Sequence, residues 1–270
     1  MSSDKSVEFT KENIDTYLRE VAKEYRKRAG KNMPAELILI GGASILINYG
    51  FRNMTTDIDA LIQASSAMKD AINYVGDKYN LSNGWLNSDF KNTDSYSEKL
   101  SQFSTYYRTY SNVVTVRTVT AEYLIAMKLR SGRQYKSDLS DIIGILSDHE
   151  KKGLPISLEQ IKEAVNSLYG SWENLPVTSQ TFIENVLRNG RFEELYGQIL
   201  KDEEETKDLL IGFEQDYPGV TKESNVDEIT GNLQKKTDRA TILAKLREKT
   251  TENDLPKKEN PKRKRTRTKR

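Results

Sequence analysis

Apolar residues follow two different periods in the first half of the chain, and each period predicts a type of element. In residues 10–29 and 67–79 they recur every three or four positions, which indicates helices with one buried face. Short apolar runs with β-branched residues indicate strands at Leu37–Ile40, Asp57–Ile62 and Asn112–Val119. The first half of the chain is therefore expected to combine a small sheet with helices.

Further helices are expected between and after these strands, and helical periodicity alone marks the second half of the chain. Their expected ranges or starting residues are 43–49, Thr120, Asp138, Ser157, 179–189 and 192–200. The acidic run Asp202–Glu205 is expected to be a solvated face. Residues 81–110 are rich in Ser, Asn and Tyr and predict no clear element, although Trp85 is expected to be a core anchor rather than a base-stacking platform.

Composition divides the chain into three parts, which are a domain of strands and helices in residues 1–150, a helical region in 151–220 and a polar segment in 221–270. The last segment ends in the basic tail Pro256–Arg270, which has nine Lys or Arg and one Glu, a net charge of +8. Because the whole chain carries +2, the preceding 255 residues carry −6. We expect the polar segment to be mostly disordered, since it cannot bury a core.

A basic tail of this kind favours contact with nucleic acid, such as tRNA, because Lys and Arg displace phosphate counterions without needing a fold. A solubilising terminus and a membrane-surface contact are the alternatives. No apolar run approaches the roughly 18 residues of a membrane span, and the polar N-terminus has no signal-peptide core. The expected location is therefore the cytoplasm.

The absence of cysteine excludes disulfides, thiolate metal sites and a cysteine nucleophile. The single histidine, His149, lies in the polar segment SDHEKKG and is expected to be a solvated loop residue. This composition therefore argues against hydrolysis by a Ser-His-Asp triad. Carboxylates, lysines and arginines must carry any catalysis.

The first two strands concentrate the candidate chemistry. Asp57 and Asp59 are two residues apart in a predicted strand, so their side chains should point the same way. Two adjacent carboxylates repel unless a cation compensates, and hard oxygen ligands suit Mg²⁺. Gly41 and Gly42 follow the first strand, where backbone N–H groups can approach a phosphate, and Ser44 can add a hydroxyl. Singly, each pattern is also typical of a tight turn or a solvated strand.

A second group of charged residues follows the last strand. Lys128 lies on the helix after it, and Asp138 and Asp141 are three apart on the next helix, so the two acids share a face. In isolation these acids could equally be first-turn residues that favour the helix dipole.

The two groups together resemble a known superfamily. Gly41-Gly42-x-Ser44 followed by Asp57-x-Asp59 resembles the signature of the DNA polymerase β-like nucleotidyltransferases. The string A-M-K-L-x-x-x-R-x-x-x-x-D-x-x-D-I, residues 126–142, resembles minimal bacterial nucleotidyltransferases related to the AbiEii toxins, and residues 85–87 resemble uncharacterised relatives. The resemblance covers about residues 35–150. It implies an α+β nucleotidyltransferase fold, with a small mixed sheet flanked by helices.

The resemblance also implies an activity, transfer of a nucleotidyl group from an NTP or dNTP to a hydroxyl acceptor with Mg²⁺ or Mn²⁺. Asp57 and Asp59 would bind the metal. The residues expected to hold the nucleotide are Gly41, Gly42, Ser44, Arg52 and Arg133. Lys128 would contact a phosphate or neutralise charge in the transition state. Asp138 and Asp141 could complete the metal site, orient Lys128 or act as a base.

One feature of the superfamily is missing, because no acid lies in the strand predicted at residues 112–119, where relatives often have a third metal carboxylate. Asp89 and Glu122 are weaker candidates for that role.

Relatives of this type imply a toxin–antitoxin or phage-defence setting, with either a toxin that modifies tRNA or protein or a synthase of a nucleotide signal, and a cognate antitoxin or effector as partner. The competing hypothesis is a non-catalytic module that binds nucleic acid or a protein. A third is an antitoxin-like partner that uses its helical second half.

Overall fold

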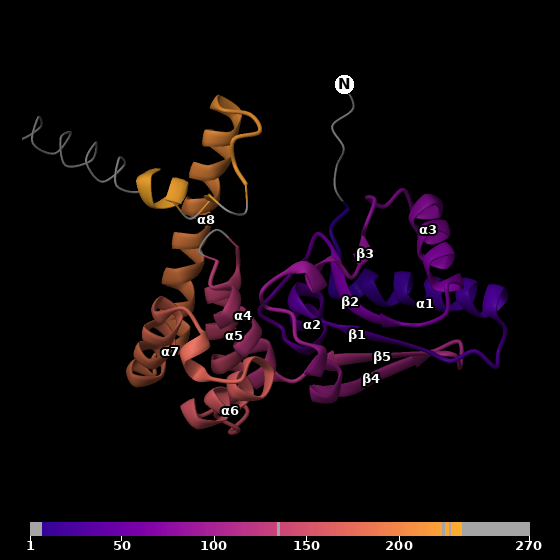
Figure 1. Ribbon diagram of the computed structural model, residues 1–270, viewed down its shortest axis with the longest axis horizontal. Coiled ribbons are helices and arrows are strands. Elements are labelled where there is room, and N and C mark those ends of the chain that lie inside the picture. The colour runs from indigo at the N-terminus through magenta and orange to yellow at the C-terminus, as the bar shows by residue number, and fades with distance from the viewer. Residues whose placement is uncertain (1–6, 134–135, 223–224, 227, 234–270) are drawn as a thin grey trace, which may run out of the picture. The chain divides into compact units, whose positions relative to one another are not determined.

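The computed structural model describes residues 7–133, 136–222, 225–226 and 228–233 (Figure 1). Contacts divide the chain into two compact units, Met1–Lys207 and Asp208–Arg270. The basic tail Pro256–Arg270, expected to be disordered and to contact nucleic acid, lies outside the described residues. No helix among the described residues is long and apolar enough to span a membrane.

Five strands form one mixed sheet in the order β3-β2-β1-β5-β4. The strands are β1 (Ala35–Leu39), β2 (Ile58–Gln63), β3 (Leu86–Asn87), β4 (Ser104–Tyr110) and β5 (Val114–Val119). The central strand β1 runs antiparallel to β2 and parallel to β5, while β4 pairs antiparallel with β5. The expected small mixed sheet is therefore present, and three of its strands coincide with the apolar runs of the sequence.

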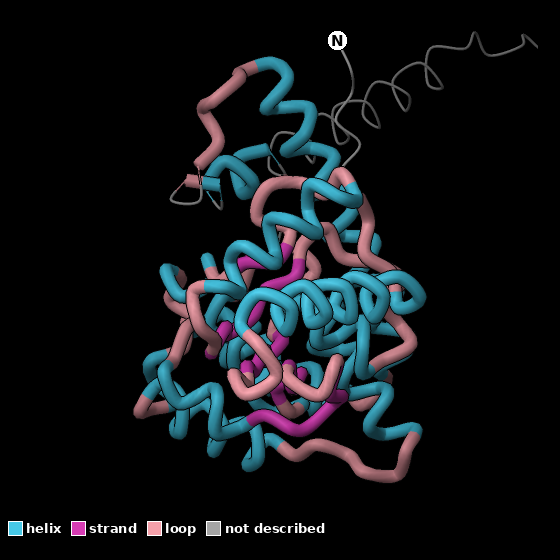
Figure 2. Tube along the Cα trace, turned by 90° about the vertical axis from the view of Figure 1, so that its right-hand side faces the viewer, coloured by secondary structure: helices cyan, strands magenta, loops and turns pink. Residues whose placement is uncertain are grey.

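Helices flank the sheet (Figure 2), whereas the edge strand β4 stays largely uncovered. The α-helices up to residue 216 of the described chain are α1 (Lys11–Ala29), α2 (Gly41–Asn48), α3 (Ala67–Tyr79), α4 (Ala121–Ser131), α5 (Asp138–Lys151), α6 (Leu158–Tyr169), α7 (Val177–Asn189) and α8 (Phe192–Asp216). Three short 3₁₀ turns lie at Asp89–Asn92, Glu98–Phe103 and Trp172–Asn174. The helices expected at residues 10–29 and 67–79 are confirmed within one residue.

Alternate residues of the central strand enter two separate cores, as strand geometry requires. Leu37 and Leu39 face α1 and α3, and Trp85 is buried in the same core, where its indole N–H donates to the carbonyl of Ile72 at 3.2 Å. The expected role of Trp85 as a core anchor is confirmed. Ile38, together with the residue after the strand, Ile40, belongs to the second core, which α4 to α8 line.

Two expectations about polar residues are wrong. His149 is not in a loop but in the last turn of α5, half-buried, with its Nε2 3.4 Å from the Tyr49 hydroxyl. Glu203, in the run expected to be solvated, is buried, because its Oε1 accepts hydrogen bonds from the backbone N–H groups of Leu139 and Ser140. The helix expected at 192–200 instead continues to Asp216 and carries this residue inward.

Candidate functional site

The glycine pair forms the first turn of α2, directly after the central strand. Gly41 has φ +55°, a backbone conformation that a side chain disfavours. At Gly42 a Cβ would lie 2.6 Å from Thr55 Oγ1 and 3.0 Å from a guanidinium nitrogen of Arg52. Gly41 is therefore required by conformation and Gly42 by close packing, and together they bring residues before and within β2 against the α2 N-terminus.

Asp57 and Asp59 lie at the start of β2, beside this turn. Asp57 is exposed one residue before the strand, and Asp59 is half-buried, with its Oδ2 3.5 Å from the Cβ position of Gly41. Burial, followed by the charge of Asp57, raises the pKa of Asp59 from 3.8 to about 6, while Lys136 and Arg133 oppose this shift. The charge of Asp57 therefore makes Asp59 harder to ionise, while the expected common direction of the two side chains stays a prediction.

This pair fits a hard divalent cation, since the positive charge of the cation would offset both the burial of Asp59 and the repulsion from Asp57 that raise the pKa of Asp59. Mg²⁺ commonly uses only one or two protein carboxylates and takes its other ligands from water and phosphates. Among the described residues, no group of three or more His, Cys, Asp or Glu is arranged to hold a metal. Asp89 also raises the pKa of Asp59, but less than Asp57 does, and its role as a third carboxylate stays a prediction.

The second predicted group forms a buried ion network between α4 and α5. Lys128 Nζ lies 2.8 Å from Asp138 Oδ1 and 2.8 Å from Asp141 Oδ2. Burial lowers the pKa of Lys128, but the two carboxylates outweigh it and leave that pKa raised. Burial would raise the pKa of Asp138, but Lys128 and then Arg133 hold it below its usual range. Lys128 and Asp138 are therefore both charged, and the ammonium is enclosed by the carboxylates of Asp138 and Asp141.

Two arginines connect this network to the glycine turn and the acidic pair. Arg52 Nη1 lies 2.5 Å from Asp141 Oδ2, its Nε donates to the carbonyl of Met54 at 3.0 Å, and its other terminal nitrogen faces Gly42. Arg133 Nε lies 3.0 Å from Asp138 Oδ2, and its charge acts on Asp59. The predicted residues of both groups thus meet around one end of the sheet.

Ser44 differs from its neighbours in the predicted site. It is completely buried in α2, and its hydroxyl has no hydrogen-bond partner within the described residues. A direct contact of this hydroxyl with a phosphate stays a prediction. Glu122, the other candidate third carboxylate, starts α4, where acids favour the helix dipole.

Several residues of the site were not predicted from the sequence. Thr55 packs on Gly42 and donates through its hydroxyl to the carbonyl of Asp57 at 3.2 Å. Gly144 of α5 lets the ring of Phe51 approach to 2.6 Å from its Cβ position, which fixes the loop that carries Arg52. Tyr196 of α8 donates to the Phe51 carbonyl at 3.3 Å. In the sequence, the one feature that could have pointed to these contacts is the position of Thr55 between the glycine turn and the acidic pair.

One protein family matches the chain. Its model, described as a nucleotidyltransferase of unknown function (DUF6036), covers residues 16–168, which is more than half of the sequence. These residues include the glycine turn, the acidic pair and the buried ion network. Neither the curated proteins nor the solved structures contain a significant match.

Proposed function

The chain belongs to this family of nucleotidyltransferases of unknown function, and from that premise we propose that it transfers a nucleotidyl group from an NTP or dNTP to a hydroxyl acceptor. The observation that carries the proposal is the convergence of two distant sequence groups. Arg52 and Asp141 are 89 residues apart, yet their side chains form an ion pair beside Gly42 and the acidic pair.

Asp57 and Asp59 would hold Mg²⁺ or Mn²⁺. When bound, such an ion neutralises phosphate charge and makes an acceptor hydroxyl a better nucleophile. The backbone N–H groups at the start of α2 would bind the triphosphate, because a helix N-terminus favours an anion. Arg52, whose guanidinium borders Gly42, would hold the same phosphates as a charged hydrogen-bond donor.

The buried network would position these groups rather than touch the nucleotide. Lys128 is enclosed by Asp138 and Asp141, so its ammonium balances their charge. The carboxylates pair with Arg52 and Arg133 and would hold the two guanidinium groups in place beside the nucleotide. We therefore propose that Asp138 and Asp141 orient Lys128, and with it the two arginines, rather than complete the metal site or act as a base. Lys128 would then be a positioning residue.

We also propose the biological setting of a bacterial toxin–antitoxin or phage-defence system, in the cytoplasm, with a cognate antitoxin or effector. The resemblance of residues 126–142 to AbiEii-related enzymes supports it. The product would be a modified RNA, such as tRNA, or a nucleotide signal.

The test is incubation of the full chain with each radiolabelled NTP and dNTP and with Mg²⁺ or Mn²⁺, in the presence and absence of total tRNA. Label in RNA would identify an RNA-modifying transferase, whereas label in short or cyclic products without RNA would identify a signal synthase. If no labelled product forms in any of these combinations, the proposed activity is contradicted.

A non-catalytic module is the second candidate, and the lack of a three-carboxylate group among the described residues favours it. Such a module would yield no labelled product and would bind its partner without a metal. Metal-dependent binding of a labelled NTP, measured by equilibrium dialysis, separates the two candidates.

A further inference from the structure

The solvent face of α1 is entirely basic over its second half. Within the described segment of residues 17–34, six charged side chains are exposed, and all six are basic. We call them the basic stripe: Arg19, Lys23, Arg26, Lys27, Arg28 and Lys31. The first 255 residues carry a net −6, so this concentration of positive charge departs from the character of the rest of the body.

Helical spacing places Arg19, Lys23, Arg26 and Lys27 on one side of α1, whereas Arg28 lies toward the opposite side and Lys31 follows the end of the helix. Arg19, Lys23 and Arg26 follow each other at intervals of four and three, which is the period of a helix surface. From Arg19 to Arg28 the helix rises about 14 Å, at about 1.5 Å per residue. That length corresponds to about four base pairs of a duplex, in which phosphates succeed each other every 3.4 Å along each strand.

The two acids between these residues do not cancel the stripe at the surface. Glu24 is buried and forms salt bridges with Arg28 Nε at 2.8 Å and Lys27 Nζ at 3.8 Å, so it helps to hold the Arg28 side chain in place. Glu20 is half-buried and shared between Lys23 and Lys78. Arg19 and Lys31 form no salt bridge with a described residue.

Two ordinary explanations do not account for the stripe. Cations favour the last turn of a helix because of its dipole, but Arg19 and Lys23 lie before the last turn of α1. A membrane-binding helix inserts an apolar face, whereas the apolar residues of α1, such as Leu18 and Val21, are fully buried in the core. What the helix offers to a partner is charge alone.

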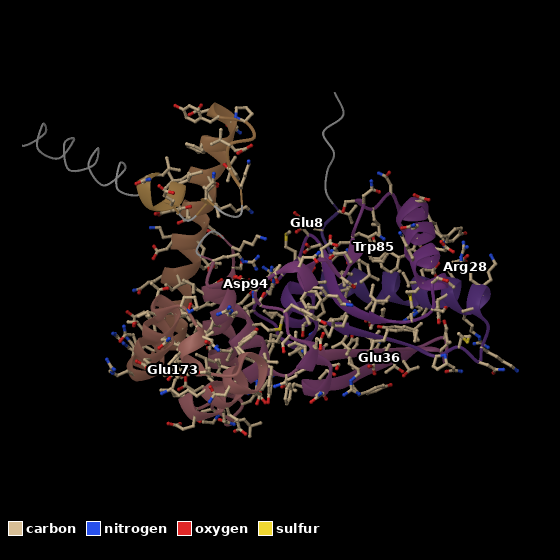
Figure 3. All side chains as sticks on the ribbon, in the orientation of Figure 1. Glu8, Arg28, Glu36, Trp85, Asp94 and Glu173 are labelled. Carbon is tan, nitrogen blue, oxygen red and sulfur yellow. The ribbon has the colours of Figure 1, made fainter. Side chains whose placement is uncertain are left out.

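We propose that the basic stripe binds the sugar-phosphate backbone of a nucleic acid. Arg28, at the end of α1 (Figure 3), also lies 5.7 Å from the ring centre of the exposed Tyr74, so a planar guanidinium and a planar ring are presented together. Arg26 uses one donor on the carbonyl of Ser111 at 3.1 Å and keeps others for a phosphate. Neither contact needs a particular base, so binding is independent of sequence.

The stripe is connected to the candidate site through the start of α1. Phe9, just before the helix, exchanges backbone hydrogen bonds of 2.8 and 2.9 Å with Thr55, which packs on Gly42. Arg19 lies eight residues into the helix, about 12 Å from its first residue. The binding surface does not rest on the proposed function, because it requires neither a metal nor a nucleotide.

The test is fluorescence anisotropy of a labelled mixed-sequence duplex, as DNA and as RNA, with the full chain at several salt concentrations. The variant Lys23→Gln/Lys27→Gln removes two exposed charges, and Lys201→Gln/Lys207→Gln removes two exposed charges from α8 as the matched control. We expect the first variant to bind at least about tenfold more weakly near physiological salt and to lose about two units of salt slope. We expect the control to bind like the unchanged chain.

Equal binding by the two variants would overturn the proposal, because the affinity would then come from elsewhere, such as the basic tail. Absence of duplex binding by the unchanged chain at about 50 mM salt would overturn it too. So would charge-dependent sedimentation of the chain with phosphatidylserine vesicles and not with the duplex. The readout is binding, so a chain without transferase activity can still pass or fail this test.

Discussion

Glu203 links α8 to the start of α5, and its charge is predicted to make stability depend on pH. Its side chain is only 7% exposed, its Oε1 accepts from two backbone N–H groups at 3.0 and 3.2 Å, and its Oε2 has no partner within the described residues. Burial raises the pKa of Glu203 from 4.5 to about 7, and the charge of Asp141 adds to that effect, while the hydrogen bonds oppose it.

The raised pKa fixes the sign of the effect. The folded protein holds the proton more tightly than the unfolded chain, so this residue costs nothing below about pH 4.5 and its full cost is reached as the pH rises through about 7. At about 1.36 kcal/mol per pKa unit, the cost of ionisation is on the order of 3 kcal/mol. Glu203→Gln keeps an acceptor for both N–H groups but cannot ionise.

The assay is urea unfolding at a series of pH values, followed by tryptophan fluorescence, for the unchanged chain and for Glu203→Gln. The exposed neighbour Glu204→Gln is the control. We expect the Glu203→Gln variant to gain about 3 kcal/mol relative to the unchanged chain between about pH 4.5 and about pH 7, with a constant difference above. A variant that is less stable at high pH would refute the reasoning, because the ionised carboxylate would then be the form that the α5 N-terminus stabilises.

Two further predictions concern the site. Lys128→Met leaves Asp138 and Asp141 facing each other without the cation between them, so the free energy of unfolding should fall by about 3–5 kcal/mol in urea titrations, whereas the exposed Lys207→Met should change little. Gly42→Ala should lower the free energy of unfolding by about 1–3 kcal/mol and weaken NTP binding, because the Cβ of the alanine would lie 2.6 Å from Thr55 Oγ1. The control is Gly50→Ala, whose Cβ would have no atom within 4 Å and which should therefore bind NTP normally. Equal stability for either pair of variants would contradict the close contacts described.

Local pattern was enough for the elements whose buried face is apolar. Residues 67–79 show this, because a helix that packs on a sheet must repeat its apolar residues with the helical period. β4 was missed because it is an edge strand, and five of its seven residues are not buried, so alternation of apolar residues is absent. A strand was predicted at residues 112–119, but β5 begins only at Val114. Ser111 and Asn112 have positive φ and belong to the hairpin turn before it.

The candidate site was predictable in its residues but not in its connections. Spacing places Asp57 beside Asp59, since both belong to one extended segment. Spacing says nothing about Arg52 meeting Asp141, because that contact depends on how α5 packs against the loop before β2. Glu203 was misread for the same reason, since a charged run is normally solvated and only the position of α5 makes one of its members a partner for backbone N–H groups.

The central claim is that Asp57 and Asp59 support nucleotidyl transfer, and one rate comparison tests it most directly. The measurement is the initial rate of label incorporation from the preferred NTP with Mg²⁺, for the unchanged chain, for Asp57→Asn/Asp59→Asn and for the control Asp94→Asn. We predict that the double variant loses at least about a hundredfold in rate, as expected when electrostatic stabilisation at the reacting group is removed, and that the control keeps its rate. Equal rates for all three proteins would contradict the claim.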